Sequence, residues 1–338
     1  MKLALTLLFA VMCVSAQGGE AIITNYLQKA RVGDALEYAN LRIFPIIVNK
    51  VMSTQDYITM DEAMDRGWLK IKETGSGQVN FVELRNTGIQ MVFLMTGEMI
   101  SGAKQDRMLK EDVLIPPKSG WIRIPVYCVE HGRWTQVSTE FRSEKLLVPN
   151  ALRQRAKISE NQSEIWDEIA ASQERMGIMS ATGTVRSNYQ DKKVENEIHE
   201  YIKRLQELPR LSKATIGVVV TTGNRIICFD MFANNGLLQK YWMKLIKSYA
   251  MDALTGGKAA IDKRYVEGFI EAIENAQYTS ISTPGLGKLV EIDSDFGKGS
   301  ALVYKSAVVH MDFFPTGVIR GHDTELRLDF RREQRLDD

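Results

Sequence analysis

Residues 41–141 consist of short apolar runs separated by turn residues, and this alternation most limits what the chain can fold into. Runs such as 79–85 and 90–95 are too short for typical helices but have the usual length of strands. Asn86–Gly88 provides turn residues between those two runs. The sequence therefore predicts a β-rich first half that contains several hairpins.

From residue 150 onward the apolar residues recur at helical spacing. Helices are expected at 150–157, 191–208, 237–254 and 262–277. Residues 216–232 and 302–314 look like two hairpins, and each ends in Asp-x-Phe. Asp230 and Asp312 are therefore candidates for equivalent strand ends of one sheet. The whole pattern predicts an α+β fold, with a β-rich N-terminal half followed by long helices and two further β-hairpins.

Three local features give sharper expectations. Residues 22–40 begin with apolar residues at helical spacing and are expected to form a helix. Leu41–Val51 is expected to be a strand in which Pro45 indicates a sheet edge or a bulge, because proline has no N–H to donate. Thr59 and Glu62 fit a capping box at the start of a short helix.

The two ends of the chain differ in character from the rest. Residues 1–16 combine a basic start, an apolar stretch and a small-residue cleavage site, which is the pattern of a secretory signal peptide. We therefore expect a secreted or periplasmic protein with no membrane contact after cleavage. Residues 17–320 are expected to form one domain, with a β-rich part at 41–141 and a mixed part at 150–315. Residues 321–338 are expected to be a charged tail.

Composition narrows the possible partners. The net charge of +1 produces no bulk field that would attract nucleic acid, so any charged ligand must be held by local groups. The expected partner is a small-molecule ligand, with a nucleotide-like compound as one candidate. The four histidines lack zinc-ligand spacing, and no glycine-rich phosphate loop is present, so neither a metal nor a cofactor is predicted. Cys128 and Cys228 lie in apolar runs and are expected to be buried thiols.

A group of polar residues follows the apolar run that ends at Val129. If Val113–Ile115 and Trp121–Val129 form a hairpin with Ile115 opposite Trp121, then Asp106 lies opposite Glu130. A bulge at Pro125 would shift this register by one residue. The hairpin places Gly102–Arg107 beside the residues that follow Val129 in either register.

This neighbourhood supplies the candidate site residues. Glu130 follows the inward-facing residues of its strand, so its carboxylate needs a partner. Glu98, just past a neighbouring strand, is expected to join the same rim. The candidates are Glu98 and Glu130 as catalytic acid or base, and Lys104, Gln105, Arg107, Arg133 and Trp134 as ligand-binding residues. The alternative is structural, because Glu–Arg pairs at strand ends often only satisfy each other.

Several blocks of the chain resemble the first type of the ARPP domain family, whose name refers to ADP-ribosylglycohydrolase and rhodanese-phosphatase-superfamily-associated proteins. The blocks, spread over residues 41–315, are Tyr57–Ala63, Gly97–Glu98, Gly102–Arg107, Val113–Pro116, Ile124–Glu130, Gly132–Trp134, Trp166–Asp167, Thr182–Gly183, Gly217–Val220 and Ser248–Leu254. Asp106 stands where the family pattern has Asn, and His131 occupies a variable position. Neither residue is therefore chosen as a site residue.

The resemblance implies a metabolite related to NAD or ADP-ribose. One hypothesis is thus an exported binding protein or hydrolase-like enzyme for a phosphorylated, nucleotide-like ligand, in which arginines hold phosphate and an indole stacks on a base. The alternative is a non-catalytic exported interaction or structural module. Metal-assisted hydrolysis through carboxylates is a third possibility. The residues alone leave open whether the protein is an enzyme.

Overall fold

The computed structural model describes residues 18–50, 52–74 and 79–316 and has an α+β fold, as predicted. The predicted signal peptide at 1–16 and the predicted tail at 321–338 lie outside the described residues. None of the helices in the described part of the chain has the length and apolar character needed to cross a bilayer.

The largest element is a nine-stranded antiparallel sheet. Its order is β1-β3-β13-β14-β18-β17-β16-β15, with β2 also paired to β3. The strands are β1 (Arg31–Val32), β2 (Leu36–Tyr38), β3 (Leu41–Ile47), β13 (Thr215–Thr222), β14 (Arg225–Phe232), β15 (Gln277–Ile281), β16 (Lys288–Ser294), β17 (Gly297–Tyr304) and β18 (Ala307–Pro315). Every residue of β13 is buried, because both faces of the sheet are covered.

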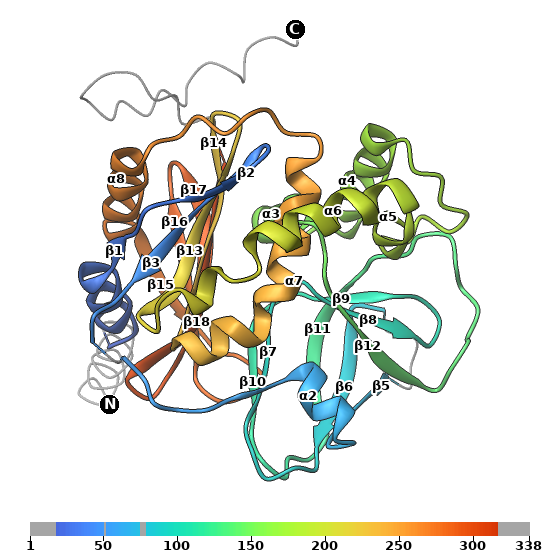
Figure 1. Cartoon of the computed structure of the whole chain (residues 1–338). Helices are drawn as coiled ribbons and strands as arrows, with labels where there is room; N and C mark the ends of the chain where they lie inside the picture. Colours follow the sequence, from blue (N-terminus) through green and yellow to red (C-terminus); the bar gives the residue numbers. More distant parts are fainter. Residues whose placement is uncertain (1–17, 51, 75–78, 317–338) are drawn as a thin grey trace, which may run out of the picture.

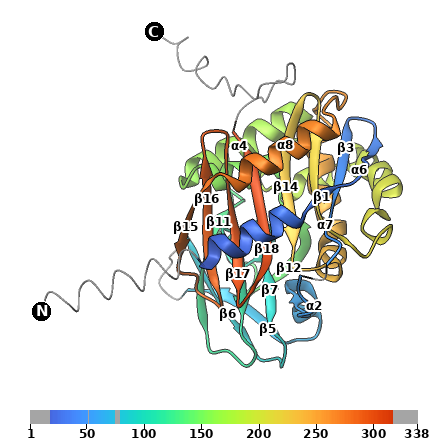
Figure 2. The ribbon, with the colours of Figure 1, turned by 90° about the vertical axis from the view of Figure 1, so that its left-hand side faces the viewer.

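Helices cover the two faces of this sheet. The helix at residues 18–29 and α8 (Lys263–Glu274) lie on one face (Figure 2). Helices α6 (Lys192–Leu205) and α7 (Asn235–Ala253) lie on the other (Figure 1). Each face has its own apolar core, and α7 contributes most of its length to one of them. Burial of this apolar surface is the main force that holds the layers together.

A closed six-stranded barrel forms the second body of β-structure, in the lower part of Figure 1. Its strands are β5 (Leu69–Glu73), β6 (Phe81–Asn86), β8 (Glu98–Gly102), β9 (Arg107–Leu109), β11 (Ile122–Cys128) and β12 (Glu140–Leu147). A small sheet beside it contains β4 (Ile58–Thr59), β7 (Val92–Leu94) and β10 (Val113–Ile115). The remaining helices are α2 (Met60–Asp65), α3 (Asn150–Ile158), α4 (Gln162–Met176), α5 (Arg186–Gln190) and the 3₁₀ helix η1 (Leu208–Arg210).

The predicted first helix is wrong in its end. It ends at residue 29 rather than 40, because 31–32 and 36–38 pair as strands with β3. Of the two alternatives predicted from Pro45, the edge is wrong, since β13 pairs with the other side of β3, but the register of the β3–β13 pair does shift beside Pro45, between Thr215 and Gly217. Pro45 is tolerated because it falls between the two short strands, where its carbonyl still accepts from Gly33 N–H at 2.7 Å.

Other local predictions are confirmed. Thr59 and Glu62 form a reciprocal capping box at the start of α2. Asp230 and Asp312 belong to the two predicted hairpins and are direct cross-strand neighbours on β14 and β18. Cys128 and Cys228 are buried free thiols.

Candidate functional site

The predicted neighbourhood of Glu130 forms at one end of the barrel. Strand β11 pairs with β9 so that Cys128 lies opposite Arg107, one residue away from the predicted register. The segment Val113–Ile115 pairs with β7 instead of β11, so the predicted hairpin is wrong in that part. The β9–β11 pair still brings Gly102–Arg107 beside Glu130.

Glu130 is the centre of a group that we call the rim cluster: Asp106, Glu130, Arg133, Thr182 and Thr184. The Glu130 carboxylate accepts from Arg133 Nε at 2.8 Å, from the Asp106 backbone N–H at 3.0 Å and from Thr182 Oγ1 at 2.8 Å. Burial alone would raise the pKa of Glu130, but hydrogen bonds from Arg133, Thr182 and the Asp106 backbone hold it below its ordinary value. Glu130 is thus an ionised and fully bonded carboxylate.

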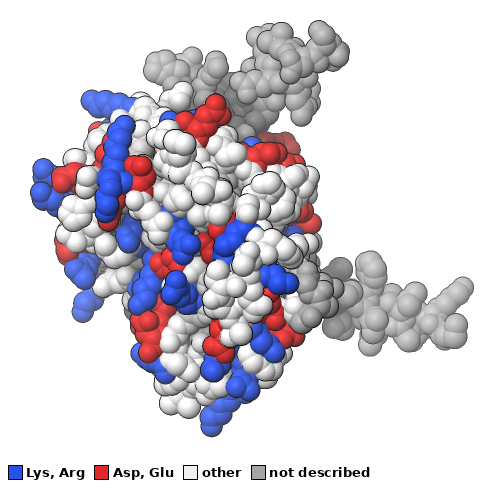
Figure 3. Space-filling view, turned by 90° about the vertical axis from the view of Figure 1, so that its right-hand side faces the viewer, with Lys and Arg blue, Asp and Glu red and all other residues white. Residues whose placement is uncertain are grey.

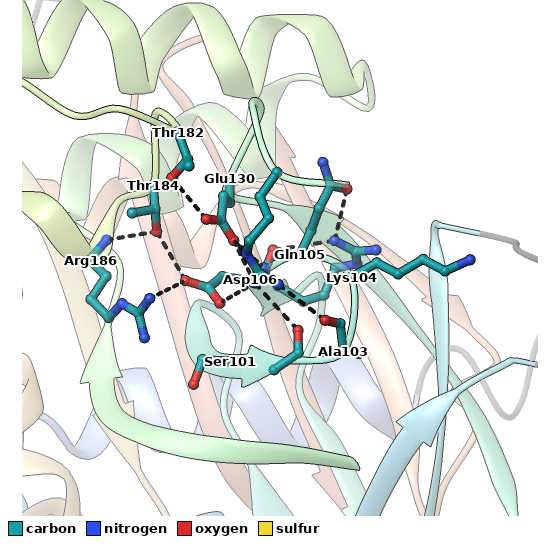
Figure 4. A network of polar contacts seen from close by, with 12 residues as sticks. Ser101, Ala103, Lys104, Gln105, Asp106, Glu130, Thr182, Thr184 and Arg186 are labelled. Carbon is teal, nitrogen blue, oxygen red and sulfur yellow. Dashed lines mark hydrogen bonds and ion pairs between the residues drawn. The ribbon is translucent and has the colours of Figure 1, made fainter. Parts of the chain in front are cut away.

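Asp106, which the family pattern argued against, is the second carboxylate of the rim cluster. It accepts from Arg133 Nη2 at 3.1 Å and from Thr184 Oγ1 at 3.0 Å, and Arg186 Nη2 lies 3.7 Å from it. In Figure 4, Thr182 points to Glu130 and Thr184 points to Asp106. Burial and the neighbouring Glu130 charge raise the pKa of Asp106.

The remaining predicted ligand-binding residues surround the rim cluster with unequal exposure. Arg107 is buried and donates to Gln105 Oε1 at 3.1 Å, while Gln105 Nε2 donates to the His131 carbonyl at 3.4 Å. Trp134 is 56% exposed, and Lys104 Nζ lies 5.1 Å from its ring centroid. The side chains of Glu130 and Asp106 are only 3% and 1% exposed, so their carboxylates are almost closed to solvent.

Glu98 does not join the rim cluster, and that prediction is wrong. It begins β8, whereas the rim cluster lies beyond the other end of this strand at Gly102, roughly 13 Å away along an extended chain. Its buried carboxylate forms an ion pair with Lys244 of α7 and accepts from the Met95 backbone N–H at 2.8 Å. Glu98 therefore ties the barrel to α7.

Sequence reasoning also missed a second set of charges, which we call the sheet network: Asp112, Arg153, Asp230 and His310. All four side chains are buried. Arg153 Nη1 donates to Asp230 at 3.0 Å, and the His310 ring lies between Asp112 at 2.7 Å and Asp230 at 3.2 Å. Burial would lower the pKa of His310, but the two carboxylates raise it to about 9. The Asp-x-Phe repeat was the signal for Asp230, but it did not indicate these partners.

A cleft of about 660 Å³ lies on a different part of the molecule from the rim cluster. It is formed by α3, the C-terminal half of α4, the start of β14 and the end of α7. Its lining includes Gln154, Arg155, Ile158, Glu168, Ser172, Arg175, Met176, Arg225, Met251 and Asp252. None of the predicted site residues lines it.

The cleft is rich in guanidinium groups, and we call it the arginine cleft. Arg175 pairs with Glu168 at 2.9 Å, and Arg155 lies 3.4 Å from Glu164, yet the two arginine side chains remain 49% and 42% exposed. The Arg225 side chain is exposed and forms no ion pair or hydrogen bond within the described residues, although its charge partly offsets the rise that burial causes in the pKa of Asp252. The cleft therefore offers cationic donors that are incompletely satisfied by the protein.

Asp252 is the acidic counterpart in the arginine cleft. It accepts from the Ala151 backbone N–H at 3.2 Å and from Asn150 Nδ2 at 3.3 Å. Burial raises its pKa to about 6, although these two hydrogen bonds oppose the shift. Among the residues that the structure describes, no three His, Cys, Asp or Glu side chains are grouped to hold a metal ion.

The distribution of charge agrees with the near-neutral sequence. On the face shown in Figure 3, basic and acidic side chains are interspersed without a broad patch of one sign. A charged ligand must therefore be held by local groups such as those of the arginine cleft.

Comparison with known proteins gives one match. Residues 29–314 match the model of a domain family described as ARG and Rhodanese-Phosphatase-superfamily-associated Protein domain, ARPP-1. No curated protein and no solved structure matches the chain.

Proposed function

This chain belongs to the ARPP-1 family, and from that premise we propose that it binds a phosphorylated, nucleotide-like metabolite, such as one related to ADP-ribose or NAD, in the arginine cleft. The single observation that carries the proposal is the group of three guanidiniums around one cleft of ligand size in the described part of the chain. Small-molecule sites commonly have volumes of about 300–1,000 Å³.

The chemistry of the lining suits such a ligand. A guanidinium presents paired N–H donors that match phosphate oxygens, and Arg225 is available for this role without breaking an ion pair. Ile158, Met176 and Met251 supply apolar surface for the uncharged part of a ligand. Methionine side chains adapt their shape readily, which favours contact with a planar ring.

The same geometry argues for binding rather than for turnover at the predicted site. The rim cluster contains the two predicted kinds of group, carboxylates and guanidiniums, but they bond to each other and are sealed from solvent. A general acid or base has to come within hydrogen-bond distance of the reacting group. Glu98 and Glu130 are both buried, which supports a structural role for the rim cluster as a connection between β9, β11 and the loop after α4.

Titration calorimetry with ADP-ribose, NAD and AMP tests the proposal. Arg225→Gln is expected to weaken binding about tenfold, since a hydrogen bond between charged groups contributes about 1.5–3 kcal/mol. Arg210→Gln is the matched control, because Arg210 is exposed and its one ion-pair partner among the described residues is the nearby Glu207. Absence of heat with all three compounds at millimolar concentration, or equal affinity of Arg225→Gln and wild type, would contradict the proposal.

A second candidate function is a non-catalytic interaction module. Its support is the exposure of Trp134, Val137 and Met179, at 56%, 64% and 97%, on the loops beside the rim cluster. Exposed large apolar residues are common at protein interfaces. Alanine substitution of Trp134 would then abolish partner binding without changing metabolite affinity in the arginine cleft.

We propose further that the protein is exported. The support is the sequence of residues 1–16 alone. Mass spectrometry of the mature protein is expected to find Gln17 as the first residue. A mature protein that still begins at Met1 would contradict export by this signal.

A further inference from the structure

Asp252 is an acidic lining residue, which is unexpected in a cleft proposed to bind phosphate. It lies near the end of α7 and lines the same hollow as Arg155, Arg175 and Arg225. A carboxylate there repels a phosphate group. If the cleft holds a phosphorylated metabolite, the part of that ligand beside Asp252 must be a hydrogen-bond donor.

The hydrogen-bonding state of Asp252 supports this reasoning. An ionised carboxylate has about four acceptor positions, and the structure fills two of them, both with long contacts from Ala151 N–H and Asn150 Nδ2. The Asp252 carboxylate therefore retains acceptor positions that no described protein group uses.

We propose, on the basis of the function above, that Asp252 accepts hydrogen bonds from the vicinal hydroxyls of a sugar. The ligand class is then ribosyl phosphates, with the arginines on the phosphate and Asp252 on the diol. A carboxylate takes both hydroxyls of a diol at once, whereas a single hydroxyl leaves one oxygen unpaired. Dinucleotide-binding folds use an acidic residue on ribose in the same chemical way.

Asp252 also has a structural role that the test must separate from binding. Its bond to Ala151 N–H satisfies the first turn of α3, whose N-cap Pro149 makes no side-chain capping bond. Asp252→Asn keeps the shape and one acceptor oxygen for that N–H, so α3 retains its contact. Asp295→Asn is the matched control, because Asp295 is exposed and does not line the cleft.

The experiment compares ribose 5-phosphate with 2-deoxyribose 5-phosphate by titration calorimetry. Wild type is expected to bind the ribose compound about tenfold more tightly at pH 7.5, as expected for one additional hydrogen bond to a charged group. Asp252→Asn is expected to lose this preference and Asp295→Asn to keep it. Thermal melting of both variants confirms that they are folded.

The preference of wild type is also expected to shrink below about pH 6, where Asp252 becomes protonated. The groups that interact electrostatically with Asp252 are Glu168 of α4, Arg225 and Cys228 of β14, and Tyr189 of α5. Arg155 and Arg175 line the same cleft. A phosphate monoester titrates near pH 6 as well, so only the ratio of the two affinities is informative.

The outcomes separate the two proposals. Equal affinity of wild type for both sugars, or an unchanged preference in Asp252→Asn, overturns the role of Asp252 but leaves phosphate binding intact. Failure of both sugar phosphates and of ADP-ribose, NAD and AMP to bind overturns the proposed function itself. Equal wild-type affinity for the two sugars overturns the role of Asp252 even if the variant does not fold.

Discussion

The rim cluster and the arginine cleft contain the same types of charged side chain, but these side chains bond to each other in the rim cluster and remain accessible in the arginine cleft. In the rim cluster, Arg133 bonds to both Glu130 and Asp106, and the two carboxylates are almost inaccessible. In the arginine cleft, the exposed side chain of Arg225 forms no ion pair or hydrogen bond within the described residues, and Asp252 has only two long hydrogen bonds there. The comparison teaches that grouped charges indicate a ligand site only where they stay unsatisfied beside a hollow.

The charged side chains of the sheet network are more deeply buried than those of the rim cluster or the arginine cleft. Arg153, Asp230 and His310 are wholly buried and join α3 to the centre of the nine-stranded sheet. Burial of ions is costly unless they are paired, so removal of one partner leaves an uncompensated charge. Substitutions in the sheet network should therefore mainly reduce stability, and substitutions in the arginine cleft should mainly reduce binding. Substitutions in the rim cluster should have an intermediate effect on stability.

The largest effect is expected for Arg153→Met. It removes the guanidinium that pairs with Asp230, and this should lower the free energy of unfolding by about 3–5 kcal/mol, the usual cost of breaking a buried ion pair. Urea denaturation followed by circular dichroism measures the change. Arg210→Met, at an exposed position, should change stability by less than about 0.5 kcal/mol. Similar losses of unfolding free energy in Arg153→Met and Arg210→Met would contradict a stabilising role for the sheet network.

The next effect is a pH dependence of stability that arises from His310. Its pKa is raised to about 9 in the folded protein, from about 6.5 when unfolded. The folded state therefore binds this proton more tightly, and the resulting stability is complete below about pH 6.5 and is lost as pH rises toward 9. The loss should be on the order of 3 kcal/mol.

Urea denaturation at pH 6.5, 7.5 and 9 measures this loss. In His310→Gln the same decrease should be absent, because no group that titrates in this window remains between Asp112 and Asp230. Parallel pH profiles for wild type and His310→Gln would show that the imidazole is not charged in the folded state.

Glu130→Gln should reduce stability by a smaller amount, and it tests directly whether the rim cluster has a structural or a ligand-binding role. The amide still fits between Arg133 and Thr182 but loses the charge that Arg133 pairs with, so about 1–3 kcal/mol of stability should be lost. The affinity of the folded variant for ADP-ribose should stay within about twofold of wild type. Lost ligand binding with an unchanged melting temperature would instead make the rim cluster the functional site.

The sequence predicted which segments meet at the rim cluster but not whether their charged side chains are buried. A hairpin argument placed Gly102–Arg107 beside Glu130, and the register error of one residue did not matter, because strand pairing fixes which segments meet. The family pattern then argued against Asp106, although the same hairpin had placed it beside Glu130. Whether these charges face solvent depends on Thr182 and Thr184, which come from a loop about 50 residues later in the chain.

The arginine cleft could not be predicted in the same way. Arg155, Arg175, Arg225 and Asp252 come from four separate helices and strands, and each looks like an ordinary surface or helix-end residue in sequence. No spacing rule links them. The prediction that Glu98 joins the rim cluster is wrong for a related reason. Strand alternation predicts which face of a strand a side chain lies on, but the ion-pair partner of Glu98, Lys244 of α7, is brought there by tertiary packing.

The sequence by itself determined the α+β class, the capping box of α2, the paired hairpins that carry Asp230 and Asp312, and the segments that meet at the barrel end. These features depend on hydrogen bonds and side-chain periods within a few residues or across one turn, so they can be read locally. Only the tertiary structure decided which charged groups are sealed and which border a hollow. Exclusion of water from a carboxylate depends on every element packed around it, and those elements are brought together only when the chain folds.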